Sequence, residues 1–167
     1  MPHALIAAYG GDTAAAARAF ADQRAERMNV TVLVDFENDS VRTALEVAEA
    51  LGPDLWGVRL DTSEQIVDRG LGADAPPGVS AQLAELVRAG LDAAGHEAVR
   101  IVVSGGFDAA KIAEFERVGA PVDAYGVGSA LLRGSNAFTA DIVRVDGRPC
   151  AKVGREERPN PRLEPVV

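Results

Sequence analysis

Four short apolar runs, rich in β-branched residues and separated by helical patterns, constrain the fold of this chain more than any other feature. They span residues 30–36, 55–60, 99–103 and 122–127. None shows the strict alternation of a strand with one face in water, so each is predicted to be a buried strand. Such runs are typical of parallel sheets, and a parallel sheet is therefore expected.

The segments between these runs carry the signals of helices. Apolar residues recur at three- and four-residue spacing in residues 40–51, 80–94 and 109–117, and an alanine-rich helix is predicted at 14–27. Capping residues precede the first three segments and a glycine follows each: Asp39 or Ser40, Ser80 and Asp108 before them, and Gly52, Gly95 and Gly119 after them. Strand, helix and strand thus repeat at least three times, which builds either a doubly wound sheet or a barrel.

The pattern changes after the fourth run. Residues 140–145 and 149–153 flank Asp146-Gly147, a dipeptide typical of a hairpin turn, so a small antiparallel ribbon is predicted. We therefore divide the chain into a partial α/β domain, residues 1–135, and a ribbon with an irregular tail, residues 136–167.

Charge and composition limit the partners of the chain. Its 167 residues carry a formal net charge of -8, which argues against broad attraction to nucleic acid or to an anionic membrane. No stretch approaches the roughly 20 apolar residues that a membrane span needs. Cys150 is the one cysteine, so no internal disulfide forms, and a cytoplasmic location is expected.

Two glycine turns follow consecutive predicted strands. They are Ser104-Gly105-Gly106 and Gly126-Val127-Gly128-Ser129. Glycine lets the backbone approach a ligand closely, and successive amides before a helix can point at one anion. One such turn is explained by geometry alone, but barrels commonly bind phosphate at two neighbouring strand ends, so the pair predicts a phosphate site.

Charged residues also follow the first two strands. Arg59 and Asp61 are two apart and face the same side, where they are suited either to an anion and a ribose diol or to an ion pair closing the barrel end. Glu37 and Asp39, with Asp35, can meet a metal bound to pyrophosphate, or simply cap the next helix. Phe107 either packs in the core or contacts a ligand.

Five segments, in their order and spacing, resemble nicotinate phosphoribosyltransferases: Met1-Pro2-His3-Ala4-Leu5-Ile6, Val34-Asp35-Phe36-Glu37-Asn38-Asp39, Val58-Arg59-Leu60-Asp61-Thr62-Ser63, Val103-Ser104-Gly105-Gly106-Phe107-Asp108 and Asp123-Ala124-Tyr125-Gly126-Val127-Gly128-Ser129. The resemblance implies part of a TIM-like parallel α/β barrel of the nicotinate/quinolinate phosphoribosyltransferase type. It also implies an ATP-dependent enzyme of the ligase class in NAD biosynthesis. Such enzymes form nicotinate mononucleotide from nicotinate and phosphoribosyl pyrophosphate, with Mg²⁺ and with ATP hydrolysis coupled through a phosphorylated histidine.

The same resemblance assigns roles to residues. It implies that His3 is the phosphorylated histidine and that Asp61 takes part in catalysis. Arg59 and Asp61 would hold the ribosyl and base region, and the residues of the two turns would bind substrate, chiefly its 5′-phosphate: Ser104, Gly105, Gly106, Gly126, Gly128 and Ser129. Independently of the resemblance, the acidic cluster after the first strand assigns the metal to Glu37 and Asp39.

The chain departs from this family in length, because members are typically more than twice as long. We therefore expect a fragment or a split-gene product that needs a homodimer partner or a complementing amino-terminal chain. Two alternatives stay open, a sugar-phosphate or nucleotide-binding module without chemistry, and a quinolinate phosphoribosyltransferase.

Overall fold

The computed structural model describes residues 1–24, 28–133, 141–159 and 161. The chain divides into two compact units, Met1–Arg133 and Gly134–Val167, and each is considered by itself. No helix within the described ranges is long and apolar enough to span a bilayer.

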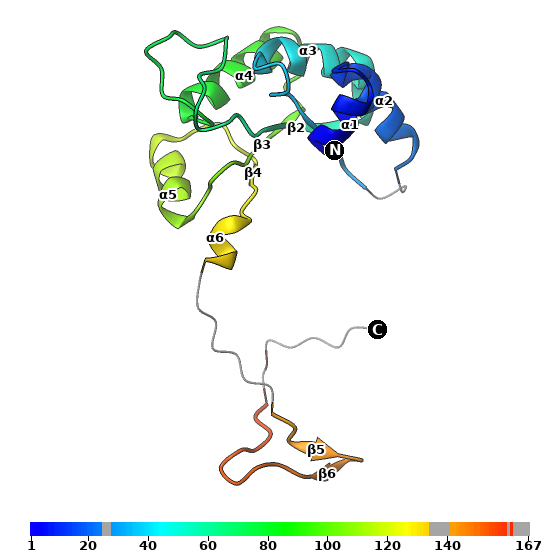
Figure 1. The fold of residues 1–167 in the computed structure, drawn as a ribbon, viewed down its shortest axis with the longest axis vertical. Coiled ribbons are helices and arrows are strands. Elements are labelled where there is room, and N and C mark those ends of the chain that lie inside the picture. Colours follow the sequence, from blue (N-terminus) through cyan, green and yellow to red (C-terminus); the bar gives the residue numbers. More distant parts are fainter. Residues whose placement is uncertain (25–27, 134–140, 160, 162–167) are drawn as a thin grey trace. The chain divides into compact units, whose positions relative to one another are not determined.

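The first unit is built on a four-stranded parallel sheet (Figure 1). Its strands are β1 (Val30–Leu33), β2 (Leu55–Leu60), β3 (Arg100–Val103) and β4 (Ala124–Tyr125), and they pair in chain order. The predicted parallel α/β fold is confirmed. A barrel is not shown, because the described strands form an open sheet with β1 and β4 at its edges.

Helices alternate with these strands: α1 (His3–Ala8), α2 (Thr13–Asp22), α3 (Ser40–Leu51), the 3₁₀ turn Gly52–Asp54, α4 (Ala81–Ala93), α5 (Ala109–Val118) and α6 (Ser129–Leu132). Side chains cap α2, α3, α4 and α5 by accepting a hydrogen bond from the amide three residues on: Asp12, Asp39, Ser80 and Asp108. The predicted helices 40–51, 80–94 and 109–117 are thus confirmed to within one residue at each end. The predicted helix 14–27 ends at Asp22, and its last three residues lie outside the described ranges.

Two strands are shorter than their apolar runs. β1 ends at Leu33 rather than at residue 36, and β4 pairs with β3 only through Ala124 and Tyr125. The apolar character continues past both strands because Val34 and Val127 still pack against the core beyond the assigned strands, where the Val34 amide makes one further hydrogen bond, to the Arg59 carbonyl at 3.2 Å. Apolar runs therefore report burial here, and not the extent of the sheet.

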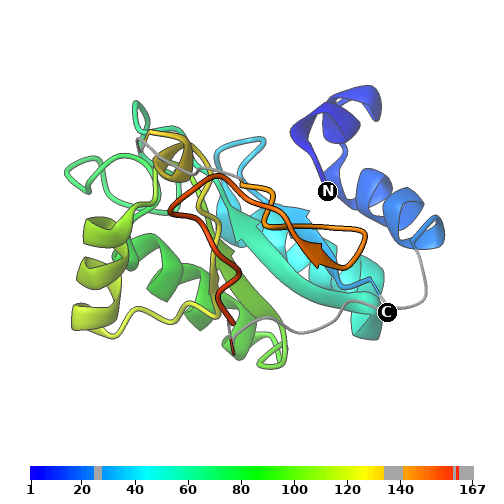
Figure 2. The same cartoon turned by 90° about the horizontal axis from the view of Figure 1, so that it is seen from below.

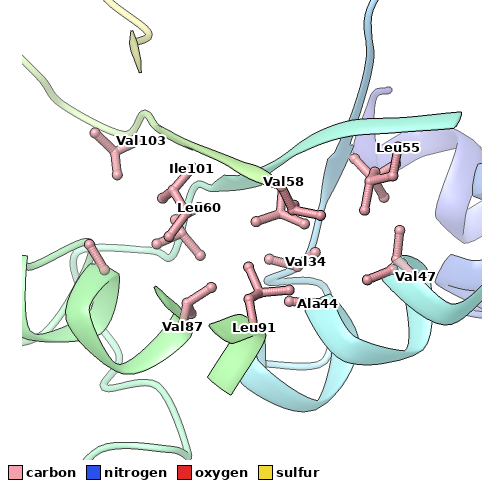
Figure 3. Close-up of a cluster of buried hydrophobic side chains, with 14 of the residues drawn as sticks. Val34, Ala44, Val47, Leu55, Val58, Leu60, Val87, Leu91, Ile101 and Val103 are labelled. Carbon is pink, nitrogen blue, oxygen red and sulfur yellow. The ribbon is translucent and has the colours of Figure 1, made fainter. Parts of the chain in front are cut away.

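The main core lies between the sheet and helices α3 and α4 (Figure 3). Aliphatic side chains from both layers are buried there. The helices contribute Val47 and Leu91, and the strands contribute Val58, Leu60 and Ile101. Burial of one such side chain is worth roughly 1.5–3 kcal/mol, so this layer fixes the strand ends in place. Helices α1 and α2 lie at one end of the unit and α5 at the other (Figure 1, Figure 2).

The second unit contains a short antiparallel ribbon. Strands β5 (Arg144–Val145) and β6 (Arg148–Pro149) pair across Asp146 and Gly147, which both have positive φ, 48° and 74°. Two positive φ values are the signature of the tight turn that Asp-Gly favours. The predicted ribbon is confirmed, though its strands are shorter than residues 140–145 and 149–153, and residue 140 lies outside the described ranges.

Candidate phosphate site at the strand ends

The carboxyl ends of β2, β3 and β4 surround one cavity of about 410 Å³. β2 contributes Arg59 and Asp61, and the two glycine turns that follow β3 and β4 form the rest of the wall together with Phe107. Because the strands are parallel and neighbouring, residues about 20 or 40 positions apart in the chain meet at the same sheet edge. The structure thus brings together every residue assigned to substrate binding: Arg59, Ser104, Gly105, Gly106, Gly126, Gly128 and Ser129.

Ser104 connects the ends of β3 and β2. Its amide donates to the Leu60 carbonyl at 2.8 Å, and its hydroxyl lies 2.9 Å from Asp61 Oδ1 and 3.2 Å from the Leu60 carbonyl oxygen. A hydroxyl has one proton to donate, and the carboxylate is the stronger acceptor. Ser104 therefore orients Asp61 at the cavity wall.

Arg59 is half-buried, and its Nε is buried without a hydrogen-bond partner among the described residues. No ion pair joins it to Asp61 within those residues, so the alternative of a closing ion pair is not formed there. A buried guanidinium donor without an acceptor costs free energy. Arg59 thus stands at the cavity wall with a guanidinium donor that the described residues leave unpaired.

The glycines of the two turns serve different purposes. Gly105 and Gly106 have φ of 86° and 69°, which other residues rarely adopt, and their amides donate to no protein group in the described part of the chain. Gly126 instead donates to the Val103 carbonyl at 2.7 Å, and a Cβ there would lie 3.0 Å from Ser104 Cβ. The first turn thus offers free amides, whereas Gly126 leaves room for Ser104.

Phe107 belongs to the core and also closes the inner wall of the cavity. It is 1% exposed and packs edge-on against Phe115 at a centroid distance of 4.9 Å. Core packing, the first predicted alternative for this residue, is confirmed, and contact with a ligand stays a prediction because Phe107 also lines the cavity.

His3 lies outside the cavity and is paired with a carboxylate. Its Nε2 lies 3.0 Å and 3.1 Å from the two oxygens of Asp35, and its side chain is 40% exposed while that of Asp35 is 8% exposed. Burial raises the pKa of the Asp35 carboxyl, although the neighbouring His3 acts in the opposite direction. A histidine with one ring nitrogen held by a carboxylate has a fixed orientation, which leaves the exposed ring edge available.

The raised pKa of Asp35 predicts a pH-dependent stability. A carboxyl whose pKa is higher in the folded state than its ordinary value of 3.8 contributes stability that is fully present below pH 3.8 and is lost as pH rises through the pKa of the folded state. We expect the free energy of unfolding of the wild type, relative to Asp35→Asn, to fall as pH rises from 3.8. Urea titrations across this range measure it. The exposed loop variant Asp74→Asn is the control and should keep the wild-type profile; an unchanged profile in Asp35→Asn would contradict the assignment.

Glu37 and Asp39 both contact Arg42 rather than gathering around an open position. Arg42 Nε donates to Asp39 at 3.1 Å, its guanidinium also pairs with Glu37, and Asp39 caps α3. Within the described ranges, no three His, Cys, Asp or Glu side chains are arranged to hold a metal. These two residues, engaged by Arg42, do not fit a magnesium site by themselves, and the capping alternative accounts for Asp39. The assignment of Mg²⁺ to them stays a prediction.

The partnership of His3 with Asp35 is the feature that sequence reasoning missed. The two residues are 32 positions apart, and the sequence pattern places Asp35 with Glu37 and Asp39 as a metal or capping residue. The available signal is the place of Asp35 two residues after β1, where side chains turn towards the ligand end of the sheet. His3 lies on α1, a six-residue helix without a side-chain cap, which local patterns do not predict.

Comparison with known proteins agrees with the family that the sequence motifs resemble. No family model matches the chain. Nicotinate phosphoribosyltransferase pncB1 from Mycobacterium tuberculosis, in strains CDC 1551 / Oshkosh and ATCC 25618 / H37Rv, is 38% identical over 96% of this chain. The crystal structure of nicotinate-nucleotide pyrophosphorylase from Pyrococcus furiosus matches 95% of this chain with 38% identity and a TM-score of 0.67.

The matched region is a limited part of each of these larger proteins. This chain spans 33% of the curated relative's length and 38% of the solved chain. Over nearly all of its own length, the chain is therefore similar to one third of a nicotinate phosphoribosyltransferase.

Proposed function

We propose that this chain carries the phosphoribosyl-binding part of a nicotinate phosphoribosyltransferase, which forms nicotinate mononucleotide from nicotinate and phosphoribosyl pyrophosphate in NAD biosynthesis. One observation carries the proposal: a single cavity collects Arg59, Asp61 and two glycine turns from three neighbouring strand ends. The similarity to a named nicotinate phosphoribosyltransferase supports it.

The chemistry follows from the lining of this cavity. The free amides of Gly105 and Gly106 are suited to the 5′-phosphate of the ribose, and Arg59 supplies a cationic donor. Displacement of pyrophosphate by the pyridine nitrogen develops positive charge on the sugar ring. Asp61, oriented by Ser104, is placed at the cavity wall to stabilise that charge.

ATP enters the proposal through His3. The pair with Asp35 fixes the ring and stabilises a positive charge on it, so the exposed edge of the imidazole is suited to accept a phosphoryl group from ATP. Mg²⁺ is expected with both phosphorylated substrates, since it binds through substrate phosphates and one or two carboxylates. The carboxylates for it are not assigned beyond the prediction for Glu37 and Asp39.

The open sheet supports a partner for the first unit. Parallel sheets are normally covered on both faces, and an edge strand exposes unpaired backbone groups. Here β1 and β4 are edges, and Thr31, Val102 and Ala124 of the strands are only partly buried within the described chain. A homodimer or a complementing chain that covers these groups belongs to the proposal, as does a cytoplasmic location.

Substitution of Gly126 tests the phosphate site. Gly126→Ala should weaken ribose 5-phosphate binding by about tenfold, because the added Cβ, 3.0 Å from Ser104 Cβ, pushes the two turns apart and loosens the Ser104 hydrogen bond that orients Asp61 at the cavity wall. Isothermal titration calorimetry measures the affinity. Gly72→Ala is the matched control, since a Cβ there meets nothing within 4 Å, and it should bind as the wild type does. Equal affinities for the wild type, Gly126→Ala and Gly72→Ala would contradict binding of the phosphate in this cavity.

A non-catalytic module that binds sugar phosphate shares this cavity but needs no reactive histidine. The two functions therefore differ at His3, because only the enzyme needs that residue to be phosphorylated by ATP.

A further inference from the structure

Lys111 connects helix α5 to the first glycine turn from outside the cavity. From the first turn of α5 its Nζ donates to the Gly105 carbonyl at 3.2 Å and lies 4.5 Å from the centroid of the Phe107 ring. Phe107 is buried, so the ring is a fixed support for the ammonium group. Lys111 does not line the 410 Å³ cavity; it lines a different one with Pro76, Pro77 and Phe115.

The Gly105 carbonyl and the Gly106 N–H belong to the same peptide unit. In a planar trans peptide these two groups point in opposite directions, so a group that holds the carbonyl also sets the direction of the N–H. Gly105 and Gly106 both have positive φ and carry no side chain that would restrict rotation of this unit. The contact with Lys111 is the hydrogen bond that fixes the carbonyl on the α5 side.

We propose that Lys111 is a positioning residue of the phosphate site, which holds the Gly105–Gly106 peptide so that the Gly106 amide faces the cavity. The inference rests on the proposed function, because it takes the cavity to bind phosphate. Lys111 acts through the peptide and does not touch the ligand. Its contribution therefore differs from that of Arg59, which lines the cavity directly.

Three variants of the full chain test the role of Lys111. Lys111→Met removes the donor and keeps the aliphatic stem, whereas Lys111→Arg keeps a cationic donor. Lys152→Met is the matched control, because Lys152 is the only other lysine and removing it changes the net charge equally. Titration calorimetry with ribose 5-phosphate should show about tenfold weaker binding for Lys111→Met. This is the loss expected when the Gly106 amide no longer donates its charge-assisted hydrogen bond to the phosphate. Lys111→Arg and Lys152→Met should keep near wild-type affinity.

A second measurement separates this role from a general loss of stability. In ¹⁵N–¹H spectra of the ligand-free chain, the Gly106 amide should shift in Lys111→Met and return towards the wild-type position in Lys111→Arg. Wild-type affinity in a folded Lys111→Met, or an unmoved Gly106 resonance, overturns the inference. Failure of the wild type to bind ribose 5-phosphate instead contradicts the proposed function, and the Gly106 resonance still decides whether Lys111 holds the peptide.

Discussion

Replacement of His3 with alanine is expected to abolish acid-labile phosphorylation of the chain by ATP. The imidazole is the proposed acceptor, and alanine offers no nucleophile in its place. Asp35→Asn should lower the rate without removing the label, because asparagine cannot stabilise a positive charge on the ring. Incubation with labelled ATP, followed by alkaline electrophoresis and autoradiography, measures the effect. The part of pncB1 that this chain does not match is supplied as a separate polypeptide.

The second histidine of the chain provides the matched control for this experiment. His96 follows α4, and within the described residues its backbone is hydrogen-bonded but its side chain is not, so His96→Ala should be labelled as the wild type is. Labelling of His3→Ala at the wild-type level would contradict the assignment of His3. An unlabelled wild type, with the complementing part present, would favour the non-catalytic binding module.

Truncation of Phe107 should cause the largest loss of stability. Phe107 is 1% exposed and contacts both Phe115 and Tyr125, at centroid distances of 4.9 Å and 5.6 Å. Phe107→Ala removes these contacts and leaves a cavity, at a cost of roughly 3–5 kcal/mol in the free energy of unfolding. Since domains are stable by only about 5–15 kcal/mol, much of the stability would be lost.

The same substitution at an exposed aromatic residue separates burial from residue type. Phe36 is 39% exposed, so Phe36→Ala should cost roughly 1 kcal/mol or less. Urea unfolding of the two variants, followed by circular dichroism, gives the comparison. Similar urea midpoints for the two variants would contradict a stabilising role of Phe107 in the core, and with it the packing that holds the Ser104-Gly105-Gly106 turn in place.

The helices could be predicted from local signals because their ends are determined by local chemistry. The side chains of Asp39, Ser80 and Asp108 each cap a helix by accepting a hydrogen bond from the backbone amide three residues later. Residue type and spacing in the sequence predict such a contact. Strand lengths depend on pairing between distant segments. The apolar run at residues 122–127 therefore overstates β4, which pairs with β3 through only two residues.

In the site, too, some residues could be placed from the sequence, whereas others depend on contacts between distant segments. The glycine turns and Arg59 with Asp61 could be placed at one edge because parallel strands bring their carboxyl ends together. The contact of His3 with Asp35 depends on how α1 and α2 pack together against β1, through Ile6, Ala16 and Leu33 respectively, and no local pattern predicts this packing. The predicted metal residues are engaged by Arg42, a contact that spacing alone did not reveal.

Closure into a barrel is the part of the fold prediction that rests on resemblance alone. The described residues form four parallel strands, and closing a barrel of the eight-stranded type requires more strands than these. The curated relative is about three times as long as the matched region, and strands that would close a barrel are part of the proposal for a partner chain.

A ¹⁵N–¹H titration of the chain with ribose 5-phosphate tests the central claim most directly. The account predicts that the largest shifts fall on the amides of Gly105, Gly106 and Gly128, which line the cavity and donate to no protein group within the described residues. A larger cavity of about 560 Å³, lined by Arg24 and Arg100 among others, lies at the opposite ends of the strands. Shifts centred on that cavity, with the glycine amides unmoved, would contradict the account.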